Sequence, residues 1–300
     1  MPERELTAIS TELSPPFVVA EPLRQTSPFV FCSPHSGRIY PRHFLRQSRL
    51  DAISLRRSED CYVDELFATV TTLGAPLIAA RFPRAYLDLN REPYELDPQL
   101  IREPLPDYAN AHSVRVVGGL GTIARIVADG ENIYRSPLPL AAAIARIDGL
   151  YFPFHKALQG LLERTSRTFG FAVLIDCHSM PSAPMSRGVI TRPDFVLGDR
   201  FGAACDNRLA RFVRDHLTGL GYDVQMNRPY AGGYITEHYG RPSRGWHALQ
   251  VEINRGLYLD ELTLERSDGY ERLAADLRGL AEAMFARMPA QLAERAAAAE

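Results

Sequence analysis

Two kinds of hydrophobic pattern alternate along this chain. Short runs that are continuously apolar, or that alternate apolar with polar residues, predict strands, and they cover residues 29–33, 77–80, 171–175, 222–226 and 248–253. Apolar residues spaced three and four apart predict helices at residues 60–70, 138–169, 207–220 and 273–288, with Pro153 interrupting the second. Because strands and helices alternate, we predict an α/β fold with a central mixed β-sheet flanked by helices in a single domain.

The segments between these elements set the expected domain limits. We divide the chain into a loose N-terminal segment, one domain and an Ala-rich tail, at residues 1–21, 22–290 and 291–300. The first segment is expected to be loose because Ser14-Pro15-Pro16 breaks regular structure. Residues 86–91 are expected to be extended. The Pro, Gly and charged residues between 92 and 134 predict excursion loops of the kind that cover a site.

Composition narrows the classes of function. The 300 residues are 46% hydrophobic, which is enough for a sizeable core. The formal net charge of -2 gives no basic excess for binding nucleic acid. Lys156 is the only lysine, so the basic residues are almost all arginines, whose planar fork matches carboxylates.

The sequence also suggests a compartment. No segment like a secretion signal opens the chain, and its apolar runs are too short to span a bilayer. The four cysteines form no CxxC pair. We therefore expect a cytoplasmic protein with reduced thiols and no membrane partner. The oligomeric state is left open.

Two histidines stand out because each follows an apolar run and precedes a serine. His35 follows the run 29–33, and His178 follows the run 171–175. Ligands in open α/β sheets bind beyond the carboxyl ends of strands, so the two imidazoles can meet in space. Two histidines, a carboxylate and one open position form a catalytic zinc site. The alternative is two unrelated loop histidines.

The third ligand is less well defined than the two histidines. Asp60 is our choice because it begins a predicted helix soon after His35, and its neighbour Glu59 is a second candidate. Acidic residues at a helix start can equally serve as caps.

A glutamate within a predicted strand suggests acid–base chemistry. Glu252 interrupts the apolar run 248–253, and a buried carboxylate there suits a general base beside a metal-activated water. The alternative is simple alternation, which would put Gln250 and Glu252 on a wet face of the sheet.

Polar residues near 84–91 suggest a place for an acidic substrate. Asn90 and Arg91 can hold a carboxylate, and Arg84 can face a developing oxyanion. A structural ion pair between Asp88 and an arginine is the alternative, or an addition. Gly232 and Gly233, in the turn 230–234, allow the backbone to approach a substrate, or form a plain turn.

These motifs together resemble one known family. They are His35-Ser36-Gly37, Asp88-Leu89-Asn90-Arg91, Asp176-Cys177-His178-Ser179, Pro229–Tyr234 and Gln250–Tyr258. In this order, from about Phe29 to Leu259, they resemble the N-formylglutamate amidohydrolase family, which is related to the zinc carboxypeptidases. The resemblance implies a phosphorylase/hydrolase-like, zinc carboxypeptidase-like fold. It also implies a zinc (Zn²⁺) enzyme that hydrolyses an N-formyl or N-acyl group from an acidic amino acid, giving formate and glutamate in the namesake reaction.

The resemblance also implies roles for individual residues. His35 and His178 match the metal histidines, and Glu252 matches the base. Asn90 and Arg91 match the pair that binds the substrate α-carboxylate, and Asp176 and Ser179 are expected to support His178.

One departure from the related carboxypeptidases leaves the third ligand open. Those enzymes carry a glutamate three residues after the first histidine, where this chain has Arg38. The carboxylate ligand must therefore come from elsewhere, and Asp60 is placed by its helix-start position alone. Two alternatives remain for the function: hydrolysis of another amide or peptide by the same chemistry, and a carboxylate-binding protein without turnover.

Overall fold

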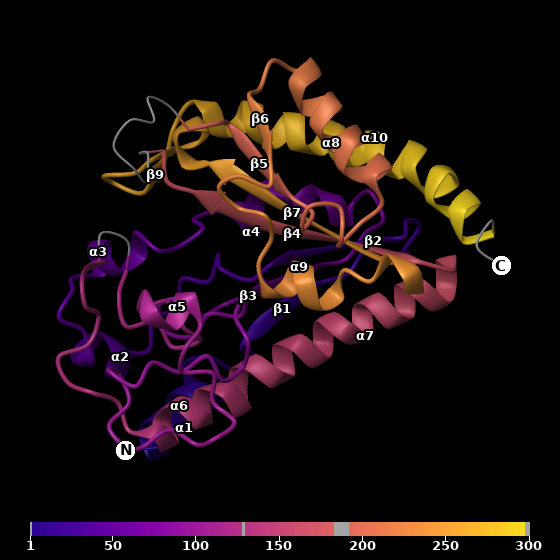
Figure 1. Ribbon diagram of the computed structural model, residues 1–300. Coiled ribbons are helices and arrows are strands. Elements are labelled where there is room, and N and C mark those ends of the chain that lie inside the picture. The colour runs from indigo at the N-terminus through magenta and orange to yellow at the C-terminus, as the bar shows by residue number, and fades with distance from the viewer. Residues whose placement is uncertain (1, 128–129, 183–191, 298–300) are drawn as a thin grey trace. The chain divides into compact units, whose positions relative to one another are not determined.

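A seven-stranded sheet organises the computed structural model, which describes residues 2–127, 130–182 and 192–297 (Figure 1). The strands are β1 (Phe17–Ala20), β2 (Phe29–Ser33), β3 (Leu77–Ala80), β4 (Ala172–Met180), β5 (Phe195–Gly198), β6 (Val224–Met226) and β7 (Trp246–Asn254). Their order across the sheet is β1-β3-β2-β4-β7-β5-β6. Strands β8 (Leu259–Asp260) and β9 (Glu265–Arg266) form a separate ribbon.

The sheet is mixed, as predicted. Strand β4 pairs in parallel with β2 on one side and with β7 on the other. Strand β5 runs antiparallel to β7 and pairs in parallel with β6. Because β2, β4 and β7 run in the same direction, their carboxyl ends lie at the same edge of the sheet.

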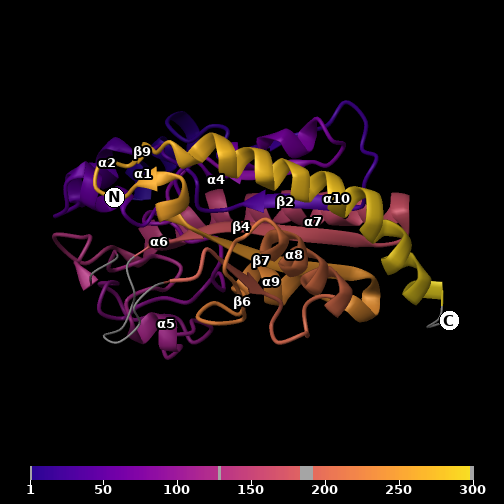
Figure 2. The ribbon, with the colours of Figure 1, turned by 90° about the horizontal axis from the view of Figure 1, so that it is seen from above.

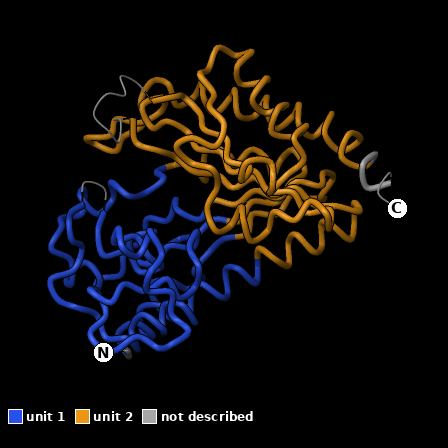
Figure 3. The backbone as a smooth tube through the Cα atoms, viewed as in Figure 1, with its two compact units in different colours: residues 1–18, 34–61, 79–157 blue, residues 19–33, 62–78, 158–300 orange. Residues whose placement is uncertain are grey.

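The chain groups into two compact units, each built from three segments (Figure 3). Unit 1 comprises Met1–Val18, Pro34–Cys61 and Ala79–Ala157, and unit 2 comprises Val19–Ser33, Tyr62–Ile78 and Leu158–Glu300. The α/β class with a mixed sheet and flanking helices is confirmed. The domain limits at residues 22 and 290 stay a prediction.

Unit 1 contains most of the short helices. They are α1 (Pro2–Thr11), α2 (Arg42–Gln47), α3 (Ala52–Arg56), α5 (Val114–Val117) and α6 (Leu140–Arg146), followed by a π turn at Ile147–Tyr151. At its centre the fully buried Arg146 makes a two-pronged ion pair with Glu5, with Nε–Oε2 and Nη2–Oε1 distances of 3.1 and 2.8 Å. His43 and the hydroxyl of Tyr86 also contact the Glu5 carboxylate.

The prediction of a loose segment before Pro22 is therefore wrong for α1 and β1. The breaker Ser14-Pro15-Pro16 follows the helix and separates it from β1 rather than preventing either. Glu5 is 1% exposed because it meets Arg146, which lies far away in sequence. A local pattern carries no sign of such a partner.

Unit 2 covers both faces of its strands with helices. Its described helices are α4 (Val63–Leu66), α7 (Phe152–Phe169, from Leu158 on), α8 (Asn207–Gly219), α9 (Tyr234–Tyr239) and α10 (Gly269–Ala297), with 3-10 turns at Ala68–Thr71, Pro242–Arg244 and Arg255–Leu257.

The two faces of β2 and β4 are covered by different helices. Phe285 of α10 packs on Phe29 and Phe31 of β2, with ring centroids 5.0 and 6.1 Å apart. On the other face, Thr236 of α9 contacts Asp176 of β4 at 3.4 Å. Figures 1 and 2 show α10 running the length of the strands.

Several predicted boundaries change. The helix predicted over 60–70 is reduced to α4 and a 3-10 turn, because Tyr62 before it has a left-handed φ of 62° and Phe67 after it leaves helical geometry. Residues 86–91 form turns rather than an extended piece. Strand β4 continues to Met180, so His178 lies inside the strand and not beyond it.

The two long helices also differ from prediction. Residues 140–169 are helical throughout. Pro153 does not end this helix, but the α-helical hydrogen-bond pattern changes to a π turn at Ile147–Tyr151, directly before the proline that lacks an N–H. Helix α10 continues through Pro289 to Ala297, so the tail predicted at 291–300 is helical as far as it is described. The Pro, Ser and Gly residues between 180 and 194 also predict a loop, most of which lies outside the described residues. No helix among the described residues has the length and apolar character needed to cross a membrane.

Candidate active site

Adjacent strands β4 and β7 place a histidine beside a glutamate. His178 pairs in register with Glu252, and Asp176 pairs in register with Gln250. Parallel strands in register point paired side chains to the same face, so these four residues share the face that α9 covers. Gln250 is 3% and Glu252 8% exposed. The alternation noted in the sequence is real, but the face is buried and not wet.

Polar contacts surround these side chains. Oδ1 of Asp176 lies at an ion-pair distance of 3.0 Å from Nε2 of His178, without the geometry of a hydrogen bond. The Gln250 side-chain amide donates to Oε1 of Glu252 at 2.8 Å, and its carbonyl accepts the Gly233 N–H at 2.7 Å. Gly233 therefore has a structural task here, since it sets the direction in which Gln250 holds Glu252.

The backbone at the neighbouring position 232 requires a glycine. Its φ is +114°, which side-chain-bearing residues rarely adopt, and an added Cβ would lie 2.9 Å from Cγ2 of Thr236. Because Thr236 also contacts Asp176 and Gln250, the turn is locked onto the face that carries His178.

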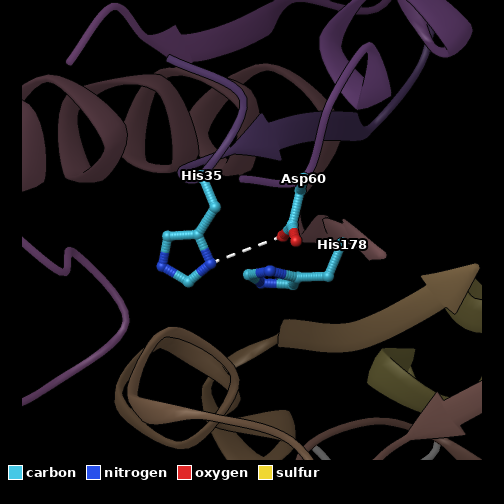
Figure 4. Close-up of side chains that lie close together, drawn as sticks. All are labelled: His35, Asp60 and His178. Carbon is cyan, nitrogen blue, oxygen red and sulfur yellow. Dashed lines mark ion pairs between the residues drawn. The ribbon is translucent and has the colours of Figure 1, made fainter. Parts of the chain in front are cut away.

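His35 follows β2 directly and lies between two carboxylates. Its Nε2 is 2.7 Å from Oδ1 of Asp88, and its Nδ1 is 3.4 Å from Oδ2 of Asp60 (Figure 4). The Asp60 N–H donates to the His35 carbonyl at 3.1 Å. Both His35 and Asp60 are buried. The backbone bond explains how Asp60 comes to face His35 although it precedes α4 rather than beginning it.

Asp88 joins His35 to the predicted substrate residues. Its carboxylate accepts from the Arg84 guanidinium at 2.8 Å and from the Asn90 backbone N–H at 2.8 Å, and it lies 3.7 Å from Nη2 of Arg91. Burial by itself raises the pKa of Asp88, but Arg84, Arg91 and His35 together hold it well below its usual range. The ion pair expected at Asp88 is present, and it sits on the same carboxylate that orients His35.

Asp60 and its neighbour Glu59 differ in the contacts of their carboxylates. Glu59 is held by the Tyr40 hydroxyl at 2.6 Å, by Nε of Arg56 at 3.1 Å and by the Cys61 thiol at 3.2 Å. Its carboxylate is thus occupied away from His35, whereas that of Asp60 faces the imidazole.

Sheet pairing explains why the two histidines belong together. Because β2 and β4 are neighbouring parallel strands with Cys32 opposite Asp176, the residues just after β2 leave the sheet at the edge where His178 lies. Among the described residues, the group of histidine and acidic side chains that could hold a metal ion is His35, Asp60 and His178 (Figure 4).

The donor set of this group fits zinc. Ligand atoms about 2.1 Å from a tetrahedral zinc are about 3.4 Å apart, and the His35 Nδ1 to Asp60 Oδ2 distance is 3.4 Å. Each imidazole also has its Nε2 next to a carboxylate, Asp88 for His35 and Asp176 for His178. Such carboxylate–imidazole pairs orient histidine ligands in metal sites.

Sequence reasoning missed two of these supporting residues. Asp88 was noted only as an ion-pair partner, although its place in Asp-Leu-Asn-Arg could have suggested more, and Gln250 was noted only for its alternation with Glu252. Asp176 was expected beside His178 and lies there. Ser179 accepts from Nε of Arg255 at 3.0 Å, and its expected support of His178 stays a prediction.

The cysteines are not metal ligands in this arrangement. All four are buried, and none forms a disulfide. Burial raises the pKa of Cys32 and Cys177 well above the usual range, and the nearby Asp176 raises both further. Both thiols therefore stay protonated, as expected for small buried apolar groups.

Comparison with known proteins identifies the family of the chain. The model of the N-formylglutamate amidohydrolase family matches residues 27–259. The chain belongs to this family. The matched span contains every residue of the candidate site described above.

Individual relatives agree with this family assignment. An N-formylglutamate deformylase of Pseudomonas aeruginosa is 29% identical over 86% of this chain and 93% of its own length. A second, from Pseudomonas putida, is 28% identical over 78% of this chain and 82% of its own length. The crystal structure of an N-formylglutamate amidohydrolase from Ralstonia eutropha is 35% identical, covers 93% of this chain and 99% of that one, and superposes with a TM-score of 0.85.

Proposed function

We propose that this chain is a zinc-dependent amidohydrolase that cleaves N-formyl-L-glutamate to formate and L-glutamate. The observation that carries the proposal is that the family match contains both a buried His–Asp–His group that could hold a metal and a buried glutamate paired with one of those histidines. Its relatives from two Pseudomonas species bear the name of this activity.

His35, Asp60 and His178 would hold the metal ion. Asp88 would keep the His35 imidazole in the tautomer that presents Nδ1, and the Asp176 carboxylate would support the His178 imidazole electrostatically. When bound, zinc supplies Lewis acidity, which polarises a carbonyl oxygen and lowers the pKa of a water molecule to about 7.

Glu252 would move the proton. As general base it accepts the proton of the attacking water while the water oxygen bonds to the formyl carbon. It then gives that proton to the leaving amine nitrogen as the C–N bond breaks. The bond from Gln250 holds one carboxylate oxygen in a fixed direction for both transfers.

Three further residues would orient the substrate. Asn90 and Arg91 would bind the α-carboxylate, and Arg84, about one-quarter exposed and held by Asp88, would face the oxyanion that develops on the formyl oxygen. Gly232 and Gly233 would shape the wall of the site through the turn that fixes Gln250.

The experiment that tests the proposal measures zinc and turnover on one preparation. We expect about one zinc per purified chain and stoichiometric release of formate and glutamate from N-formyl-L-glutamate. Full activity in zinc-free protein would contradict the metal role. Turnover of other amides only would favour a different hydrolase, and ligand binding without turnover would favour a carboxylate-binding protein.

Glu252→Gln is expected to retain zinc but to lower kcat by about 10²- to 10⁴-fold, because the amide keeps the shape of the side chain and cannot accept the proton. Zinc content and steady-state formate release measure the two effects. Glu265→Gln, at an exposed position of β9, is the matched control and should leave both unchanged. An unaltered kcat in the Glu252 variant would rule out the base role.

Arg91→Lys is expected to raise KM for N-formyl-L-glutamate by about 10-fold or more, because lysine keeps the charge but loses the planar fork. The KM for N-formyl-4-aminobutyrate, which lacks the α-carboxylate, should change little. Steady-state kinetics on both substrates measures the difference. An equal rise for both would mean that Arg91 does not bind the α-carboxylate.

A further inference from the structure

A buried acid in unit 1 lies beside a partly exposed arginine. Glu95 is 3% exposed, and its Oε2 has no hydrogen-bond partner among the described residues. Nη1 of Arg115 lies 4.0 Å from this oxygen, on a side chain that is 34% exposed. A carboxylate buried without hydrogen bonds is destabilising unless a charge compensates it, so this pair calls for an explanation.

The loop that carries Arg115 is hydrogen-bonded to Arg91. The Leu120 N–H donates to the Arg115 carbonyl at 2.7 Å, and the Leu120 carbonyl accepts from Nε of Arg91 at 2.8 Å. Ser113 caps the start of α5 by accepting from the Val116 N–H at 3.1 Å. Arg115 therefore sits on a short closed turn that rests against the arginine proposed to bind the α-carboxylate.

The same loop packs closely against the segment that carries Asp88 and Glu95. Thr122 donates its N–H to the Glu95 carbonyl and accepts the Asp88 N–H on its own carbonyl, both at 2.8 Å. An added Cβ on Gly121 would lie 2.2 Å from the Glu95 carbonyl oxygen, so only glycine allows this approach. The positions of Arg115, Arg91 and Asp88 are thus fixed relative to one another.

The charges near Arg91 favour an added anion. Three guanidinium groups, from Arg84, Arg91 and Arg115, are accompanied by the carboxylates of Asp88 and Glu95. Burial lowers the pKa of Arg91, and the neighbouring Arg84 and Arg115 lower it further, although Asp88 and Glu95 oppose them. Arg115 has the longest distance to a carboxylate of the three, and about one-third of its side chain is exposed.

An acidic substrate would bring a further carboxylate to these three guanidinium groups. N-formyl-L-glutamate carries two carboxylates, and Asn90 with Arg91 accounts for one. We infer that Arg115 binds the side-chain carboxylate of the substrate, and that Glu95 is the positioning residue that aims Arg115 at it. This inference rests on the proposed function and deepens it by naming the residue that selects acidic over neutral substrates.

Two substrates and one substitution test the inference. N-formyl-L-glutamine has the shape of N-formyl-L-glutamate without the side-chain charge. In Arg115→Gln, kcat/KM for N-formyl-L-glutamate should fall by about 10- to 150-fold, the scale of one charged hydrogen bond. The value for N-formyl-L-glutamine should change less than about threefold, so the preference for the acid is lost. Arg102→Gln, at an exposed arginine in the same loop region, is the matched control.

The Glu95→Gln variant tests whether Glu95 positions Arg115 for the substrate or only supports the fold. It should raise KM for N-formyl-L-glutamate and leave kcat and all constants for N-formyl-L-glutamine near wild type. If either variant lowers kcat/KM equally for both substrates, or for neither, the inference is wrong.

A binding measurement distinguishes failure of the inference from failure of the proposed function. Calorimetric titration with L-glutamate and L-glutamine needs no turnover. Wild type should prefer L-glutamate, and Arg115→Gln should lose that preference. If wild type releases no formate, the proposed function fails, and this titration still decides the role of Arg115. Equal preferences in the two proteins would overturn it.

Discussion

Replacing His178 with alanine is expected to remove both the bound zinc and the release of formate. The substitution deletes one of three ligands and leaves Asp176 buried beside an empty space, since Asp176 contacts His178 at 3.0 Å. A zinc site reduced to His35 and Asp60 lacks the third protein ligand that catalytic zinc sites use. Metal analysis after gel filtration, together with a formate assay, measures both losses.

His216→Ala is the control for this experiment, because His216 lies in the last turn of α8 and contacts none of the proposed ligands. It should retain zinc and activity. Removing zinc from the wild-type protein with a chelator should reproduce the His178→Ala result, and adding zinc back should restore activity in wild type alone. A zinc-replete, active His178→Ala protein would end the metal proposal.

Replacing Glu5 with alanine is expected to lower the free energy of unfolding by about 3–5 kcal/mol, the scale for breaking a buried ion pair. The substitution leaves the guanidinium of Arg146 fully buried and without its two carboxylate contacts. It also removes the acceptor for His43 and Tyr86. Urea unfolding followed by circular dichroism measures the loss.

Glu3→Ala is the matched control, since Glu3 is exposed on the same helix and its loss should change stability by less than about 0.5 kcal/mol. Equal unfolding free energies for the two variants would show that the buried pair does not hold α1 in place.

The Glu5 contribution should also depend on pH. Burial raises the pKa of Glu5, but Arg146, His43 and Tyr86 outweigh it and lower the pKa from 4.5 to about 2. A carboxyl with a depressed folded-state pKa adds stability above its unfolded pKa and loses it as the pH falls toward the folded value. The stability difference between wild type and Glu5→Gln should therefore shrink between about pH 4.5 and pH 2.

Local pattern predicted the strands that carry the candidate site. The runs at 29–33, 171–175 and 248–253 became β2, β4 and β7, because apolar side chains in such runs must be buried wherever they occur. The antiparallel strand β5 was not predicted, since Phe195–Gly198 is short and follows a stretch of sequence rich in Pro, Ser and Gly. Helix α1 was missed because its buried partner Arg146 lies on α6.

In the candidate site, too, the sequence predicted some residues and missed others. Motifs in the sequence pointed to His35, His178 and Glu252, and the family match covers all three. The motifs did not reveal that the Asp88 carboxylate contacts both His35 and Arg84. Nor did they reveal that Glu59 is engaged by Tyr40 and Arg56 and leaves Asp60 to face His35.

The sequence by itself determined the α/β class, the strands near which the two histidines lie and the family to which the motifs belong. These follow from neighbours in the chain, because hydrophobic periodicity and motif order are local. Only the tertiary structure decided that the face bearing Glu252 is buried, which acid faces His35, and that Arg115 meets Glu95 beside Arg91. Burial and charge pairing depend on contacts between distant residues, and those contacts exist only once the chain has folded.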